Sequence, residues 1–248
     1  MANRQRAEAR RKAQAKAHRF NGEEGGGTNK MAIWIGVIVV IAFAAGVIVF
    51  ASRGDDSKAD PSVTTQNTSG LASLPDSQPV TVTGAALPAL DAAANPDPAI
   101  GMDAPLLSGL NFSGTPIVMD PATKGPYMLV FLAHWCVHCN AEVPRLINWK
   151  NSGGVPAGLN IIGVPTAVSE TAPNYPPAVW FSNKGWPFPA LVDEKQGDGA
   201  AGKAATAYGA SGWPYFVIVG ADGKVKARVS GEVEISDLQT IVDTALAT

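Results

Sequence analysis

The chemistry that this sequence encodes most clearly lies in its only two cysteines, Cys136 and Cys139, in the segment CVHC. They follow an apolar run that predicts a buried strand, and they precede a segment of helical composition. A cysteine in the first turn of a helix faces unpaired N–H groups and the positive end of the helix dipole, and both favour the thiolate. The spacing also brings the two sulfurs within bonding reach. We therefore expect Cys136 to be an exposed attacking thiolate, covered on one side by Trp135, and the more buried Cys139 to be the resolving thiol.

From about residue 98 onward, short apolar runs separated by Gly and Pro predict the elements that position this pair. The expected strands are 115–119, 127–133, 159–164, 188–192, 215–219 and 224–229, of which the last two flank the turn Ala221-Asp222-Gly223 as a hairpin. The expected helices are 140–150, interrupted at Pro144, then 178–183, 200–208 and 235–247, the last with Ser236 as N-cap. Strands that alternate with helices and end in a hairpin and a helix predict a three-layer α/β domain over residues 98–248.

The first fifty residues predict a membrane anchor. Residues 1–30 carry eight basic and three acidic side chains, and residues 31–50 are twenty residues without a charge. A helix of that length spans about 30 Å, the thickness of a bilayer's hydrocarbon core, and it exceeds the roughly 7–15 apolar residues of a cleaved signal peptide. Basic residues stay on the cytoplasmic side, so we expect a single-pass protein of the cell membrane with a cytoplasmic N-terminus and an extracytoplasmic domain.

The rest of the composition limits the class of partner. Residues 51–97 are rich in Ser, Thr, Pro, Asp and Ala and show no lasting period, which predicts a flexible linker between the anchor and the domain. The whole chain has a formal net charge of -2. Binding to phosphate backbones needs a basic face, so we expect no nucleic acid as partner.

Residues 129–144, LVFLAHWCVHCNAEVP, resemble the active-site region of the thioredoxin superfamily, and are most similar to the membrane-anchored TlpA/ResA-like thiol-disulfide oxidoreductases. Trp135, both cysteines, Glu142 and Pro144 occupy the matching positions. The resemblance covers about residues 98–248. It implies a thioredoxin-like three-layer α/β/α sandwich with an N-terminal β-hairpin extension, which here corresponds to residues 101–119.

The resemblance also implies a cis-proline next to the cysteines. Gly212-Trp213-Pro214, before the expected strand 215–219, corresponds to that site. Pro165 lies in a closer copy of the common motif, but it follows a strand instead of opening one. We therefore assign Pro214, and expect the backbone of Gly212 and Trp213 to bind an extended client peptide. Trp213 replaces the small or β-branched residue that is usual in the family, which should reshape the groove.

Two further positions concern proton handling and charge at the cysteines. Many thioredoxins bury an acid where this chain has Val130, so Glu142 is a candidate substitute for proton transfer, although we expect it on an exposed helix face. His138 directly precedes Cys139. A histidine there can stabilise the Cys136 thiolate and make the disulfide a better oxidant, whereas the simpler alternative is that it points into solvent.

These observations predict a bacterial membrane-anchored enzyme that exchanges disulfides with client proteins, uses no cofactor beyond the Cys136–Cys139 disulfide, and depends on a membrane redox-recycling partner. The direction stays open, because His138 favours oxidation of clients and the resemblance favours reduction, for example to give apocytochrome c thiols in cytochrome c biogenesis. The non-enzyme alternative is a tethered metal-binding or metallochaperone module that uses both cysteines with His134 and His138. Structural zinc usually takes two separated ligand pairs, and a haem-attachment motif would have His at position 140, where Asn140 stands.

Overall fold

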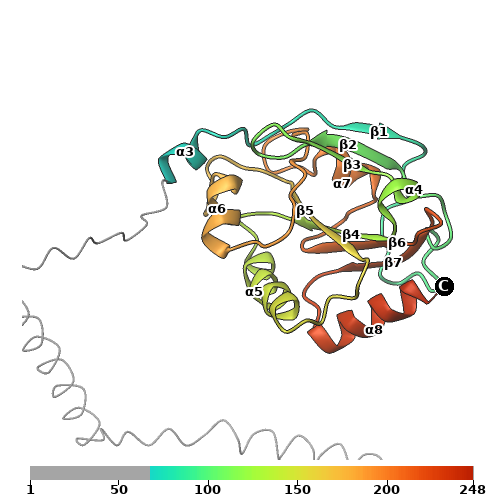
Figure 1. Cartoon of the computed structure of the whole chain (residues 1–248). Coiled ribbons are helices and arrows are strands. Elements are labelled where there is room, and N and C mark those ends of the chain that lie inside the picture. The colour runs from blue at the N-terminus through green and yellow to red at the C-terminus, as the bar shows by residue number, and fades with distance from the viewer. Residues whose placement is uncertain (1–67, 248) are drawn as a thin grey trace, which may run out of the picture. The chain divides into compact units, whose positions relative to one another are not determined.

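The computed structural model describes residues 68–247, so the predicted basic segment 1–30, the predicted anchor 31–50 and the first part of the predicted linker lie outside the described residues. Within the described part, no helix is both long and apolar enough to cross a bilayer. The elements in chain order are α3 (Thr68–Ala72), β1 (Thr81–Thr83), β2 (Leu106–Leu110), β3 (Pro116–Met119), α4 (Pro121–Lys124), β4 (Tyr127–Leu132), α5 (Val137–Asn151), β5 (Asn160–Pro165), α6 (Pro177–Lys184), α7 (Lys203–Ala207), β6 (Tyr215–Val219), β7 (Val225–Ser230) and α8 (Ile235–Leu246) (Figure 1).

The central sheet has four strands in the order β5-β4-β6-β7. Strand β4 runs parallel to β5 and antiparallel to β6, and β6 runs antiparallel to β7. Every residue of β4 and β6 is buried. Both faces of the sheet are covered, which explains why these two strands are continuous apolar runs in the sequence.

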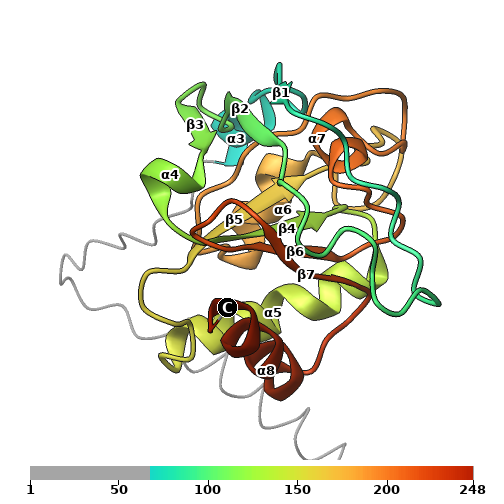
Figure 2. The same cartoon turned by 90° about the vertical axis from the view of Figure 1, so that its right-hand side faces the viewer.

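Two different layers cover this sheet. Helices α5 and α8 lie on one face, and the small sheet β1-β2-β3 lies with α7 on the other (Figures 1 and 2). Alternate residues of β4 enter the two cores: Val130 packs with the α5 and α8 side, and Phe131 with the other. The predicted three-layer α/β domain is confirmed. Its second outer layer is largely β-structure, however, and differs in this respect from the predicted α/β/α sandwich.

The predicted N-terminal hairpin is present and has an extra strand. Strands β2 and β3 pair antiparallel, with Leu107 opposite Met119. Strand β1 pairs with the other side of β2, so that Thr81 lies opposite Ser108. The third strand comes from the segment that the sequence assigned to the linker.

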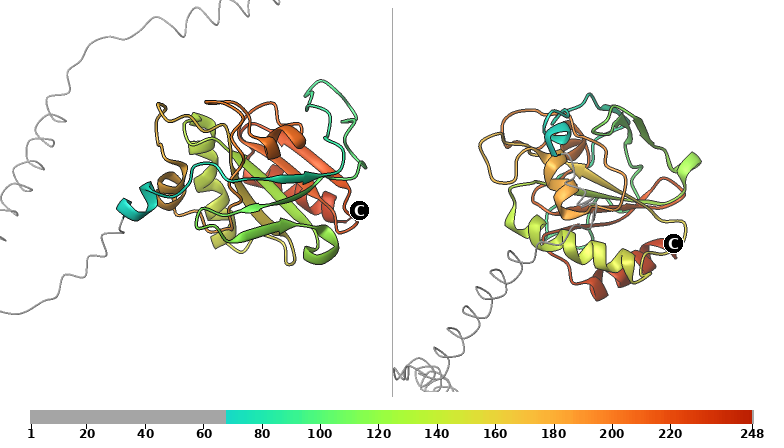
Figure 3. Two further views of the ribbon diagram at one scale, coloured as in Figure 1. Left: turned by 90° about the horizontal axis from the view of Figure 1, so that it is seen from above. Right: turned by 60° about the vertical axis from the view of Figure 1, so that its left-hand side comes forward.

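The prediction of a flexible linker up to residue 97 is wrong for residues 68–97. This segment contains α3, which lies beside α6 (Figure 3), and strand β1. The side chains of Val80 and Leu87 are buried in the core under the small sheet, and the Leu87 N–H donates to the Ala207 carbonyl at 2.9 Å. The apolar residues here are too widely spaced to form a period in the sequence. Their burial depends on partners far along the chain.

A buried ion pair holds the end of this segment against the sheet. The Arg228 side chain on β7 is fully buried, and its Nε donates to Asp97 Oδ2 at 2.8 Å. The same guanidinium donates to the Pro88 carbonyl at 2.6 Å. The hydrogen bond from Arg228 to Asp97 lowers the pKa of Asp97 below its usual value. The Arg228 guanidinium on β7 therefore binds both ends of the segment 88–97.

Two other predicted elements differ from the structure. Residues 188–192 form only a single parallel bridge, between Ala190 and Gly163, because Pro187 and Pro189 have no N–H with which to build a ladder. Helix α8 begins one residue after Glu234, whose extended backbone makes it the N-cap, so Ser236 lies inside the first turn.

The Asp97–Arg228 pair should contribute measurably to stability. We expect Asp97→Ala to lower the free energy of unfolding by about 3 kcal/mol, because it leaves the buried Arg228 charge uncompensated. Asp103→Ala, which breaks an exposed pair with Lys224, should change it by less than about 1 kcal/mol. Denaturant unfolding of the full chain measures both values, and equal effects of the two substitutions would contradict this role.

Candidate active site

The cysteine pair lies at the junction between β4 and α5. Cys136 is the N-cap of α5, with an extended backbone (φ −71°, ψ 124°), and Cys139 lies in the first turn of the helix. Both are free thiols. The exposed fraction is 7% for Cys136 and 0% for Cys139. Cys139 is therefore the more buried thiol, as predicted, but Cys136 is much less exposed than expected.

The turn before β6 covers Cys136. The Trp213–Pro214 peptide bond is cis, whereas Pro165 is not among the cis prolines of the described residues. The Cys136 Sγ donates to the Trp213 carbonyl at 3.5 Å, so this turn lies directly against the sulfur. A Cβ on Gly212 would lie 2.9 Å from the Ser230 hydroxyl, so the absence of a side chain at residue 212 lets this turn pack against β7.

Trp135 is fixed beside the cysteines by the loop that follows β5. Its indole Nε1 donates to the Ala167 carbonyl at 2.7 Å, and its ring packs against the core that includes both cysteines. Ala167 has a positive φ of 49°, a conformation that is uncommon for a residue other than glycine. Trp135 therefore lies next to the pair, as the sequence predicted.

Asn140 holds the first turn of α5 in place, a role that the sequence did not signal. Its side-chain amide donates to the carbonyls of His134 and Cys136, at 3.1 and 2.9 Å, and accepts from the Trp180 indole at 2.9 Å. Pro144 has no N–H to bond the Asn140 carbonyl, and Lys184 Nζ lies 3.3 Å from that oxygen instead. With this replacement partner, α5 continues through Pro144 and is not interrupted there, contrary to the prediction.

Glu142 is completely buried, which corrects the expectation of an exposed helix face. Its Oε2 accepts from the Val233 N–H at 3.2 Å and from Arg145 at 3.3 Å, because the loop between β7 and α8 folds over this side of α5. Its Oε1 has no hydrogen-bond partner among the described residues. Burial raises the pKa of Glu142, and it also raises the pKa of the Cys139 thiol one helical turn earlier. Glu142 therefore binds a proton more readily than an exposed carboxylate does.

His138 does not contact the cysteine that it was expected to stabilise. Its side chain is 61% exposed, and Nδ1 lies 2.7 Å from Glu232 Oε1 on the loop after β7. The hydrogen bond from His138 lowers the pKa of Glu232, which is therefore the ionised acceptor. Ninety-four residues separate the two partners in the chain, so no local pattern could have predicted this pair.

The other histidine near the cysteines, His134, is a buried structural residue. Its Nδ1 lies 2.7 Å from the Pro173 carbonyl, which can only accept, and its Nε2 accepts from the Ser169 N–H at 3.3 Å. Burial lowers the pKa of His134, consistent with a neutral ring. Within residues 68–247, no group of three or more His, Cys, Asp or Glu side chains has the arrangement of a metal site. Both rings form their hydrogen bonds with groups other than the sulfurs: His134 bonds Pro173 and Ser169, and His138 bonds Glu232.

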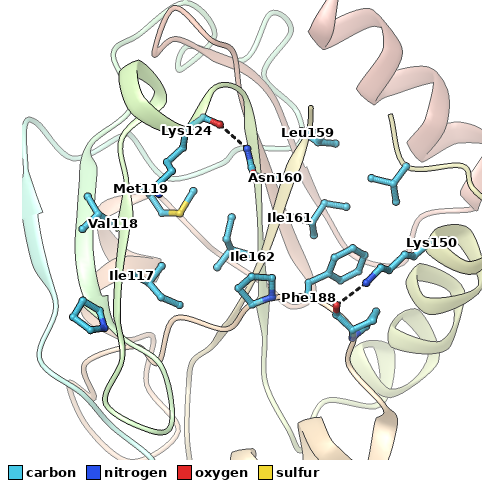
Figure 4. Close-up of a pocket in the computed structure, with 14 residues that line it drawn as sticks. Ile117, Val118, Met119, Lys124, Lys150, Leu159, Asn160, Ile161, Ile162 and Phe188 are labelled. Carbon is cyan, nitrogen blue, oxygen red and sulfur yellow. Dashed lines mark hydrogen bonds between the residues drawn. The ribbon is translucent and has the colours of Figure 1, made fainter. Parts of the chain in front are cut away.

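A cavity of about 510 Å³ lies elsewhere, between β3 and β5 (Figure 4). Its walls include Ile117 on β3, Ile161 on β5 and Phe188, with Lys124 and Lys150 at its edge. It opens beside the beginning of β5, whereas the cysteines follow the end of the parallel strand β4. This cavity therefore forms no part of the thiol site.

Comparison with known proteins gives one family match. Residues 100–228, which include both cysteines and Pro214, match the AhpC/TSA family. No match is found among curated proteins.

Several solved structures are also similar to this chain. One is a thiol:disulfide interchange protein of the thioredoxin family from Chlorobium tepidum TLS, with 23% identity, 58% of this chain and 96% of that chain covered, and a TM-score of 0.46. Another is a secreted Mycobacterium tuberculosis disulfide oxidoreductase homologous to E. coli DsbE, with 24% identity, 55% and 93% covered, and a TM-score of 0.44. A third is StoA from Bacillus subtilis, with 16% identity, 58% and 98% covered, and a TM-score of 0.44.

Because Glu142 is buried, replacing its carboxyl group with a neutral amide should stabilise the folded chain, to an extent that depends on pH. Its folded-state pKa is raised above the ordinary 4.5, so the folded chain binds this proton more tightly than the unfolded chain. The wild type therefore loses stability as pH rises from the unfolded value through the folded one. We expect Glu142→Gln to be more stable than the wild type at neutral pH, with no such gain at about pH 4.

Denaturant unfolding of both chains across this pH range measures the difference. Glu234→Gln removes the same charge from a side chain that is 71% exposed, and should change the pH profile much less than Glu142→Gln does. A Glu142→Gln chain that loses stability at neutral pH would show that the ionised carboxylate is instead a stabilising group.

Proposed function

The chain belongs to the AhpC/TSA family, and on that premise we propose that it is a thiol-disulfide oxidoreductase that exchanges disulfides with client proteins through Cys136 and Cys139. The observation that carries this proposal is the position of the two sulfurs at the start of α5. Cys136 caps the helix beside the Trp213–Pro214 turn, and Cys139 is fully buried one turn further. Such a pair has one thiol that a client can reach and one that only Cys136 can reach.

The hydrogen bond between Cys136 and Trp213 belongs to the resting thiol. A thiol can donate to the Trp213 carbonyl at 3.5 Å, but a thiolate has no proton to donate. Ionisation of Cys136 therefore breaks this contact. The carbonyl is then available to accept an N–H from an extended client segment, which is how main-chain recognition aligns a peptide beside a strand or turn.

The exchange takes place in two steps. The Cys136 thiolate, whose proton has gone to water, attacks a client disulfide; a mixed disulfide forms and one client thiolate leaves. Cys139 then loses its proton and attacks Cys136 Sγ, which releases the second client thiolate and forms the Cys136–Cys139 disulfide. Two electrons pass from the cysteine pair to the client, and the reverse sequence oxidises a client dithiol.

Glu142 is the group that takes the proton of Cys139 in the second step. It follows Cys139 by three residues, so the two side chains share one face of α5. Burial keeps Cys139 protonated, and the attack therefore needs a nearby acceptor. The unpartnered Oε1 of Glu142 is such an acceptor, and it takes the place of the acid that many thioredoxins bury where this chain has Val130.

We propose reduction of client disulfides as the working direction. The feature that favoured oxidation was a histidine that stabilises the Cys136 thiolate, and the His138 ring is paired with Glu232 instead. Reduction of a disulfide to give the thiols of apocytochrome c is a reaction of this type, and it needs a partner that returns electrons to the pair after each cycle.

The site of action that we propose is the extracytoplasmic face of the cell membrane. It rests on the sequence of residues 1–50, with its basic head and its uncharged apolar segment 31–50. A membrane partner that re-reduces the Cys136–Cys139 disulfide fits this location, because disulfide chemistry persists in oxidising compartments.

Replacement of the resolving cysteine should trap the clients. In the Cys139→Ser chain the mixed disulfide at Cys136 cannot be resolved, so covalent client adducts should accumulate and disappear when the gel sample is reduced. The matched control is Cys136→Ser, which keeps the buried Cys139 and should form none. Loss of adducts in Cys139→Ser, or equal adducts in the control, would refute the assigned roles.

The redox potential of the pair decides the direction. We expect a value near the roughly −270 mV of thioredoxin for a reductant, and His138→Ala should move it by less than about 15 mV. Equilibration of the full chain with glutathione buffers, read by mass spectrometry, measures both. A value near the roughly −120 mV of a strong oxidant would overturn the reductive direction, while leaving the exchange chemistry intact.

A further inference from the structure

One guanidinium on α5 joins the buried acid to the protein surface. Arg145 lies 3.3 Å from Glu142 Oε2, 3.0 Å from Glu232 Oε2 and 3.3 Å from Glu234 Oε1. His138 contacts the other oxygen of Glu232 at 2.7 Å. A single positive charge is thus shared between one buried and two solvent-accessible carboxyl groups.

The charged groups around Glu142 act on it in opposite senses. Arg145, on the same helix, favours the ionised form of Glu142, and Glu232, from the loop after β7, disfavours it through like-charge repulsion. Cys139 is the titratable group one turn earlier on α5. Neighbours from β4 and β6 in the same core, such as Val130 and Phe216, are apolar. Burial and the Val233 N–H hydrogen bond act most strongly on Glu142, and Arg145 and Glu232 are the charged side chains that act on it in opposite senses.

We propose that Arg145 and Glu232 are positioning residues that govern, in opposite senses, how readily Glu142 accepts the proton of Cys139, and so set the pH at which Cys139 resolves the mixed disulfide. This inference rests on the proposed function. Arg145 touches neither sulfur and acts only through Glu142. Glu232 acts by drawing the Arg145 charge outward and by adding a negative charge near Glu142. His138 holds Glu232 in this position through its own hydrogen bond.

The reaction of the reduced full chain with dithiobis-nitrobenzoate separates the two steps. The Cys136 thiolate attacks this aromatic disulfide, forms a mixed disulfide and releases one coloured thiolate. Cys139 then gives its proton to Glu142, attacks Cys136 Sγ and releases the second coloured thiolate. The fast phase reports Cys136 and therefore the proposed function. The slow phase reports Cys139, and its pH profile reports Glu142 and the groups that tune it.

Charge removal at the two positions should shift the slow-phase profile in opposite directions. Arg145→Gln should move its midpoint up by about one pH unit, and Glu232→Gln should move it down by about half a unit, with the fast phase unchanged. Arg145→Lys should restore most of the Arg145→Gln shift. Glu234→Gln removes an equal charge from the far side of Arg145 and should give a smaller downward shift. In a Glu142→Gln background, the Arg145 and Glu232 shifts should vanish.

Each remaining outcome counts against a specific claim. Shifts in the same direction, no shift, or shifts that persist in the Glu142→Gln background would overturn the proposal, provided that the fast phase is intact. Absence of the fast phase in the wild type would overturn the proposed function itself. Arg145 and Glu232 are both about one-third exposed, so the variants should fold. If Arg145→Gln does not fold, Arg145→Lys still allows the slow phase to be measured.

Discussion

The packing of the first turn of α5 against the Trp213–Pro214 turn is the constraint on which the site depends. It places Cys136 Sγ 3.5 Å from a backbone carbonyl and leaves Cys139 completely buried behind it. Asn140 maintains this position, because its side chain bonds the carbonyls just before the helix and the indole of Trp180. The difference between the two thiols is therefore a consequence of how one helix begins.

The burial that separates the two sulfurs also creates a need for proton transfer. Cys139 and Glu142 both have raised pKa values because neither is solvated. The compensating charge comes from Arg145, which the β7–α8 loop surrounds with Glu232 and Glu234. The same loop covers Glu142 through the Val233 N–H, so one short connection both buries the acid and supplies the charges that tune it.

The sequence predicted those elements and site residues that depend on local patterns. Continuous apolar runs predicted β4 and β6, and the Cys spacing after a strand predicted a dithiol at a helix start. The prediction failed where contacts with residues far along the chain determine the structure. Residues 68–97 have the composition of a linker, yet Val80 and Leu87 are buried and Asp97 accepts from Arg228. Likewise, Glu142 is buried by a loop some ninety residues further along the chain, and His138 is turned away from Cys136 by Glu232. Such contacts leave no periodic trace near the residues concerned.

The most direct test of the account is the order in which the two thiols of the reduced, folded full chain react with iodoacetamide, followed by peptide mass spectrometry. We expect Cys136 to be alkylated more than about tenfold faster than Cys139, and the difference to disappear when the chain is unfolded. Equal alkylation of the two cysteines in the folded chain, or a Cys136 that reacts only after unfolding, would contradict it.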